Sequence, residues 1–150
     1  MKKICQVCFI PRSTDFGLLV LRLWFGLTMF FNHGIVKLRH YSQMSGMFPD
    51  PLHIGSQASL ILAIVAEVLG AALVVLGFAT RLGALLLVIE LSIVFFGVHH
   101  AALAMGAHSG ELAFLYLGAF LTVLFAGGGR FVICKKTNDL GTPTPASAAV

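Results

Sequence analysis

Charged residues are scarce in this sequence of 150 residues, at 11% compared with roughly 25% in a soluble domain. Hydrophobic residues make up 58%, and the mean hydropathy is +0.94. Because the apolar residues lie in long runs, we expect lipid rather than water around much of the chain. The net charge of +4 does not indicate a nucleic-acid-binding protein, since the basic residues stand at the ends of apolar runs.

The sequence also lacks the common signatures of cofactor and catalytic sites. It has no nucleotide-binding loop, no c-type haem signature and no Ser/His/Asp arrangement. Its three cysteines, Cys5, Cys8 and Cys134, exclude a framework of fully paired disulfides. Cys5 and Cys8 have the C-x-x-C spacing of redox pairs, which leaves a redox or metal-binding role for them as a minor alternative. We therefore expect no bound metal and no resident redox cofactor.

Four apolar stretches are candidates to cross a bilayer core of about 30 Å. They span residues 16–36, 58–78, 82–104 and 111–126, and the last is the shortest. GFATR joins the second to the third, with Gly77 as the expected helix end, so these two should form an antiparallel hairpin. The sequence predicts an all-α, integral membrane four-helix bundle over residues 16–131, with tails at 1–15 and 132–150. Pro49 and Pro51 exclude a continuous helix in the first loop, which should form a structured cap.

Lysine and arginine indicate the orientation. Only Lys37 and Arg39 fall on one side of the predicted bundle, together with all six histidines. The other side has seven basic residues: Lys2, Lys3, Arg12, Arg81, Arg130, Lys135 and Lys136. We therefore predict a multi-pass membrane protein with both termini in the cytoplasm and the histidines on the outer side.

Three ionisable residues lie inside the apolar runs, where such groups either fix helix register or mark ligand and proton pathways. Their depths along the helices predict an ion pair between Arg22 and Glu67, with Glu90 close by. Two carboxyl groups beside one guanidinium imply that one of them carries a proton at neutral pH, and we expect this to be Glu90. The alternatives are an ion pair without chemistry and a Glu90 carboxyl that bonds to a backbone carbonyl.

Glycines share a helix face with the ionisable groups, and we expect these faces to point inward, since glycine lets helices approach closely in lipid. In the first helix the face carries Arg22, Gly26, Met29, His33 and Lys37. In the second helix the face carries Ala63, Glu67, Gly70, Val74 and Gly77. In the third it carries Gly83, Glu90 and Gly97, and in the fourth it carries Glu111, Gly118, Thr122 and Phe125.

The ordered set of motifs resembles the DoxX family of small four-helix bacterial membrane proteins. The matching stretches are LRLWFGLTMFFNHGIVKL, FPDPLHIG, AEVLGAALVVLGFATRLGALLL and GELAFLYLGAFLTVLFAGGGRF, which together cover most of residues 16–131. No single motif is specific, but the ordered set is. The ending GGGRFVICKK departs from a Ser-Leu-Asp ending that is frequent in the family, so no role is assigned to it.

The resemblance implies a multi-pass protein of the bacterial cytoplasmic (inner) membrane that is linked to redox work. One relative is similar to a subunit of a thiosulfate:quinone oxidoreductase, and others are associated with oxidative-stress complexes. The positions that match the family's recurrent polar residues are Arg22, His33, Lys37, Glu67, Glu111 and Tyr116, with His99 as a further match. Glu90 matches no general feature of the family.

A quinone headgroup needs hydrogen-bond partners and an apolar slot. The residues expected to line such a site near the outer face are His33, Lys37, His99, Glu111 and Tyr116, with Phe30, Phe31, Phe95 and Phe96 as walls. The alternative for these aromatic residues is interfacial anchoring. A metal site of His33, His99 and Glu111 is a weaker alternative.

The sequence thus predicts an accessory membrane subunit of a redox complex, quinone-linked or concerned with oxidative stress, that binds a quinone-like molecule. Its expected partners are membrane lipids, redox proteins and further copies of itself, and no nucleic acid. One alternative is a non-catalytic adaptor that recruits enzymes through its tails. Another is a proton or small-solute transporter that uses Arg22, Glu67 and Glu90, although four unbroken spans without repeats make this less attractive.

Overall fold

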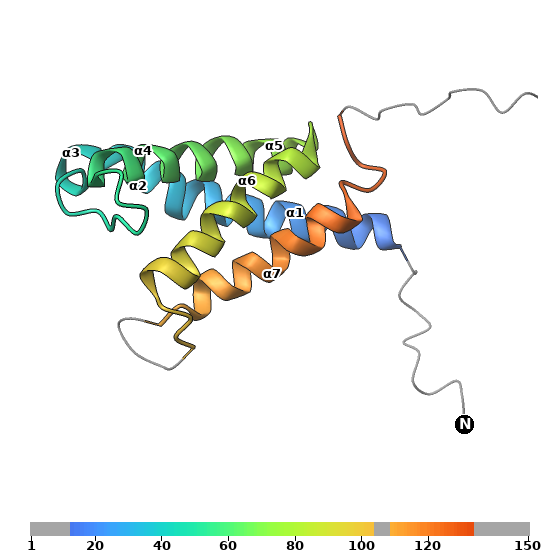
Figure 1. Ribbon diagram of the computed structural model, residues 1–150. Coiled ribbons are helices and arrows are strands. Elements are labelled where there is room, and N and C mark those ends of the chain that lie inside the picture. Colours follow the sequence, from blue (N-terminus) through green and yellow to red (C-terminus); the bar gives the residue numbers. More distant parts are fainter. Residues whose placement is uncertain (1–12, 104–108, 134–150) are drawn as a thin grey trace, which may run out of the picture.

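The computed structural model describes residues 13–103 and 109–133, and all regular structure in these ranges is helical (Figure 1). The predicted tails, the Cys5–Cys8 pair and His108 lie wholly or largely outside these ranges. The first long helix consists of α1 (Thr14–Thr28), the π-helical η1 (Met29–Ile35) and α2 (Val36–Arg39), and the short α3 (Tyr41–Met44) follows it. The second consists of α4 (Ser56–Val65), η2 (Ala66–Gly70) and α5 (Ala71–Leu76). The third consists of α6 (Thr80–Ser92) and η3 (Ile93–Val98), and the fourth is α7 (Glu111–Ala126).

The four helices confirm the predicted all-α membrane bundle. Three of them, Thr14–Arg39, Ser56–Leu76 and Thr80–Val98, are long and apolar enough to cross a membrane. The fourth has 16 residues, or about 24 Å at the rise of an α-helix, and is shorter than a usual span. The third helix ends at Val98 rather than at 104, because His100 and Ala101 have positive φ angles of 49° and 57°.

The second and third helices form the expected antiparallel hairpin. Gly77 ends α5 with φ +73°, a left-handed conformation that glycine adopts at little cost. At the same end of the bundle, the backbone N–H of Arg130 donates to Asp15 Oδ1 at 2.9 Å. This bond joins the start of α1 to the segment after α7, so the two ends of the described bundle lie together.

The helices are close together at the end with Asp15 and Arg130 and diverge toward the other end. Figure 1 shows α6 and α7 running away from the first two helices in this direction. The contacts between elements agree with this divergence. α6 packs on α5 and η2, whereas α4, toward the other end, packs on η1 and η2. The core lies between the four helices and includes Met29, Val74, Leu87, Phe120 and Val123. The divergence leaves room at the loop end, and the cavities described below lie there.

The inward face of the fourth helix differs from the prediction. Glu111, Gly118, Thr122 and Phe125 are all exposed. The buried face instead carries Ala113, Tyr116, Leu117, Ala119, Phe120 and Val123. Because α7 is apolar on nearly every side, packing of its aromatic and alanine residues decides its rotation rather than the glycine spacing. Gly97 of the third helix is also exposed. It still packs against the loop, because a Cβ added at Gly97 would lie 2.8 Å from the side chain of Pro51.

The first loop is a structured cap, as the two prolines indicated. Asp50 anchors it by accepting hydrogen bonds from the Ser59 hydroxyl at 2.7 Å and from the backbone N–H groups of Gly55 at 2.7 Å and Ile54 at 3.1 Å. The Ser59 hydroxyl, and after it these two N–H groups, lowers the pKa of Asp50. Asp50 is therefore ionised at neutral pH and holds the loop against the start of α4.

Candidate functional site

Each of the three long helices contains a π-helical stretch, and each stretch contains or adjoins an ionisable residue of the site. His33 lies in η1, Glu67 lies in η2, and η3 connects the helix that carries Glu90 to His99. The π-helical turn is rare and occurs frequently at functional sites. Two of the stretches touch, since a Cβ on Gly34 would lie 2.8 Å from the Val68 side chain and 3.2 Å from its backbone nitrogen. Glycine at position 34 therefore permits the close approach of η1 to η2.

Glu67 forms an ion pair with Lys37, and the predicted pairing of Glu67 with Arg22 is wrong. The Lys37 ammonium donates to Glu67 Oε1, and the side chains are 17% and 3% exposed. The ammonium also lies 5.8 Å from the centre of the Phe48 ring, which places a cation over an aromatic face. Lys37 lies on the first long helix and Glu67 on the second. The flexible four-carbon stem of Lys37 lets its ammonium reach across to Glu67.

Arg22 instead binds backbone carbonyls, with 1% of its surface exposed. Its guanidinium donates to the carbonyls of Val74 at 2.9 Å and Val75 at 3.2 Å, near the end of α5. It also donates to Gly128 at 2.6 Å and Phe131 at 2.8 Å, after α7. The last carbonyls of a helix lack partners within that helix. The Arg22 guanidinium has five N–H donors and lies level with the end of α5, so it satisfies these carbonyls. Glu67 lies seven residues before Val74, or about 10 Å along the helix, which explains why the pairing failed.

Glu90 lies in the same interior as Glu67, as predicted, but neither carboxyl group is fully satisfied. The two residues are 8% and 2% exposed, and Oε2 of each has no hydrogen-bond partner in the part of the chain that the structure describes. A buried polar atom without a partner is rare in proteins and needs an explanation. The proton expected on Glu90 remains a prediction.

A cavity of about 250 Å³ collects most of the residues predicted for the ligand site. Its lining includes His33, Lys37, His99 and Tyr116 together with Glu67 and Glu90, and apolar contacts come from Met29, Leu91, Val94, Leu112 and Ala113. We call this space the polar chamber. Glu111 does not line it, and the side chain of Glu111 is exposed at the first turn of α7.

Tyr116 stands in an aromatic cluster at one wall of the polar chamber. Its ring meets those of His33 and Phe25 edge to face, each with centroids 5.5 Å apart, and stacks on Phe120 at 6.2 Å. These contacts hold the Tyr116 ring in place. The four phenylalanines that were expected as walls do not line the chamber. Phe31 and Phe96 are more than half exposed, at 56% and 61%, which agrees with the alternative of contact with lipid.

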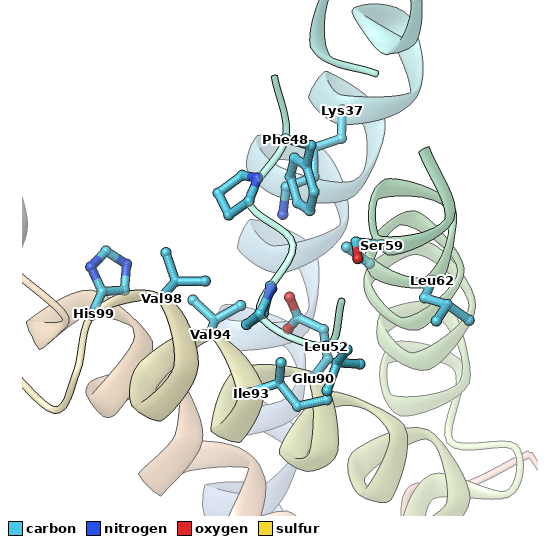
Figure 2. Close-up of a pocket in the computed structure, with 13 residues that line it drawn as sticks. Lys37, Phe48, Leu52, Ser59, Leu62, Glu90, Ile93, Val94, Val98 and His99 are labelled. Atoms are coloured by element: carbon cyan, nitrogen blue, oxygen red, sulfur yellow. The ribbon is translucent and has the colours of Figure 1, made fainter. Parts of the chain in front are cut away.

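A second cavity, of about 340 Å³, opens beside the polar chamber and is almost wholly apolar (Figure 2). We call it the apolar groove. Its walls are Phe48, Pro49, Pro51 and Leu52 from the loop, Leu62 and Ala63 from α4, and Ile93, Val94 and Val98 from η3. Lys37, Glu90, Val94 and His99 line both spaces. Figure 2 shows Lys37 and Glu90 reaching toward this shared region from different helices.

The structure does not assemble the alternative metal site. Within residues 13–103 and 109–133, no group of three or more His, Cys, Asp and Glu side chains could hold a metal ion. His33 and His99 do line the same chamber, but Glu111 lies apart from them.

Sequence reasoning missed the contribution of the loop to the site. Phe48 and Pro51 help to close the apolar groove, and Ser59 helps to anchor Asp50. The run FPDPLHIG had already indicated a structured cap, yet nothing in it specifies which helices the cap would cover. The depths of Arg22, Glu67 and Glu90 do not reveal the pairing of Lys37 with Glu67, because the long side chain of Lys37 reaches away from its own position on the helix.

Comparison with known proteins gives two matches. The family model described as DoxX matches residues 17–100, which is more than half of the chain. The chain is also 32% identical over 116 residues to an uncharacterized protein of Haemophilus influenzae (strain ATCC 51907 / DSM 11121 / KW20 / Rd), with 72% of this chain and 81% of that protein covered. No solved structure matches at a significant level.

Proposed function

Because the chain belongs to the DoxX family, we propose that this membrane protein is an accessory subunit of a redox complex, quinone-linked or concerned with oxidative stress. Its polar chamber would bind a quinone-like headgroup near the outer face of a bacterial inner membrane. Both termini would lie in the cytoplasm, on the side that has most of the basic residues. Electrons would come from a partner protein.

The observation that carries this proposal is the pairing of hydrogen-bond donors and acceptors in one chamber. His33, His99 and Tyr116 have ring nitrogens or a hydroxyl that can donate, while Glu67 and Glu90 present carboxyl oxygens. An oxidised quinone accepts hydrogen bonds at its carbonyl oxygens, and the reduced quinol donates from its hydroxyls. A chamber with both kinds of group suits both redox states.

The apolar groove supports the same proposal. Natural membrane quinones have an apolar tail beside the polar ring, and the groove offers an apolar space that shares four lining residues with the chamber. The combination of an apolar pocket with few convergent polar groups is typical of small-molecule sites.

The test is equilibrium binding of a radiolabelled, water-soluble short-chain quinone to the protein in lipid nanodiscs. Tyr116→Phe removes the hydroxyl that would bond to the quinone and should weaken binding by roughly three- to tenfold, and His33→Ala should weaken it at least as much. Glu111→Gln is the matched control, because the exposed Glu111 lies outside the chamber and should leave binding unchanged. Quenching of Trp24 is a poorer readout, since this residue is 70% exposed and lipid-dissolved quinone would reach it.

Saturable binding that Tyr116→Phe weakens and Glu111→Gln preserves would support the proposal. Binding that is absent, or that is equal in empty nanodiscs, would overturn it and favour the adaptor that acts through its tails.

A further inference from the structure

Two residues that line the polar chamber each have a buried carboxyl oxygen without a partner among the described residues. Oε2 of Glu67 and Oε2 of Glu90 make no hydrogen bond within residues 13–103 and 109–133, although both residues are more than nine-tenths buried. Both residues line the polar chamber, and Glu90 also lines the apolar groove. Leaving such groups unmatched costs free energy, so the site is built to receive hydrogen-bond donors at these oxygens.

The charges around these oxygens leave room for one more cation. The groups that face Glu90 across the chamber are Lys37 and His33 from the first helix, Glu67 from the second, His99 beyond η3 and Tyr116 from α7. The Lys37 ammonium is bound to Glu67 Oε1 and lies over Phe48. Arg22 is held by four carbonyls elsewhere. One ammonium thus stands beside two carboxyl groups, and in a low-dielectric interior the second carboxylate needs a proton or a cation.

The apolar groove sets the shape of the molecule that could supply this cation. Its volume of about 340 Å³ falls in the usual range for small-molecule pockets, about 300–1,000 Å³. Phe48, Pro51 and Leu62 wall the groove, and Glu90 lines both the groove and the polar chamber. Figure 2 shows Glu90 on the groove side. An inorganic cation would leave the groove empty. An amphipathic molecule would fill it and place its polar end beside Glu90.

We propose that the junction of the groove and the chamber binds an amphipathic primary amine, with its ammonium on Oε2 of Glu90 and Glu67 and its apolar body in the groove. The three N–H donors of an ammonium match the two unpartnered oxygens and supply the missing positive charge. When Glu90 carries a proton in the empty site, binding releases that proton to solvent, so one cation enters as one proton leaves. This proposal goes beyond quinone binding and does not depend on it.

The test compares three probes that share one phenylbutyl body, on the full chain in nanodiscs. These are 4-phenylbutylamine, the neutral alcohol 4-phenylbutanol, and the trimethylammonium derivative of the amine, which keeps the charge but has no N–H. The amine should bind saturably, and the other two should bind roughly tenfold more weakly or worse. Amine affinity should rise with pH between about 6 and 8, where the amine stays charged because alkylamines titrate near 10.4. A pH indicator in weak buffer should report close to one proton released per amine bound.

Glu90→Gln should weaken amine binding by roughly tenfold or more and abolish the proton release. Glu111→Gln, which removes an exposed carboxylate outside the chamber, should change neither. Thermal unfolding of both variants checks that the fold is intact. If Glu90→Gln does not fold, the comparison of the three probes on the unmodified protein still decides the question.

Equal binding of the alcohol, or amine binding that Glu90→Gln leaves unchanged in a folded protein, would overturn the proposal. The same holds for non-saturable uptake that empty nanodiscs reproduce. Tyr116→Phe separates this proposal from the quinone site, because it should weaken quinone binding and leave amine binding nearly unchanged.

Discussion

At the scale of single residues, the buried cations of this protein have separate tasks. Arg22 satisfies backbone carbonyls at the end where the helices are close together. Lys37 neutralises Glu67 near the end where the helices diverge. The sequence places Arg22 inside an apolar run and Lys37 just beyond the end of that run, but side-chain reach and the position of unsatisfied carbonyls decide the partners. These depend on how the helices pack, which is why the Arg22–Glu67 pairing could not be corrected from the sequence.

Arg22→Gln should strongly destabilise the bundle. It removes a charged donor from four carbonyls, and we expect a loss of roughly 3 kcal/mol or more in the free energy of unfolding. Arg81→Gln is the control, because Arg81 is exposed and donates one bond, to Phe125 at 3.2 Å. That change should cost less than about 1 kcal/mol. Reversible unfolding in mixed detergent micelles measures both, and equal losses would contradict the role given to Arg22.

At the scale of helices, most boundaries were predictable and two features were not. The apolar runs located the helices, and Gly77 marked the end of α5, because both depend on local sequence. The rotation of α7 was not predictable, since Phe120 and Phe125 are equally apolar yet are 0% and 76% exposed. The π-helical stretches were also hidden, because a spacing of three and four residues assumes regular α-helix throughout. These stretches shape the chamber, so the detailed site could not follow from the sequence.

Gly34→Ala should weaken the contact between η1 and η2. The new Cβ would lie 2.8 Å from the Val68 side chain and 3.2 Å from its backbone nitrogen, and we expect a loss of about 1–3 kcal/mol in the free energy of unfolding. Gly118→Ala is the matched control on α7, where a Cβ would meet nothing within 4 Å. It should be neutral or stabilise by up to about 1 kcal/mol, since alanine favours helix. Unfolding in mixed micelles distinguishes the two, and a harmless Gly34→Ala would show that the helices are farther apart than described.

At the scale of the whole molecule, the bundle has a tight end and an open end. The tight end holds the Asp15–Arg130 bond and Arg22, and the open end holds the loop cap, the polar chamber and the apolar groove. His33, Lys37, His99 and Tyr116 line one chamber at the open end, while their role in binding a ligand stays a prediction. The sequence prediction placed Glu111 with them because of the mistaken rotation of α7. The central claim is therefore that Lys37 and Glu67 form the charged pair of the polar chamber.

A double-mutant cycle of Lys37→Met and Glu67→Gln, measured by reversible unfolding in mixed micelles, tests this claim most directly. Lys37→Met alone leaves a buried carboxylate unpaired and should cost roughly 3 kcal/mol, and adding Glu67→Gln should recover most of that loss. The corresponding cycle of Arg22→Gln and Glu67→Gln should be additive within about 0.5 kcal/mol. Additivity for Lys37 and Glu67, or strong coupling between Arg22 and Glu67, would contradict the account.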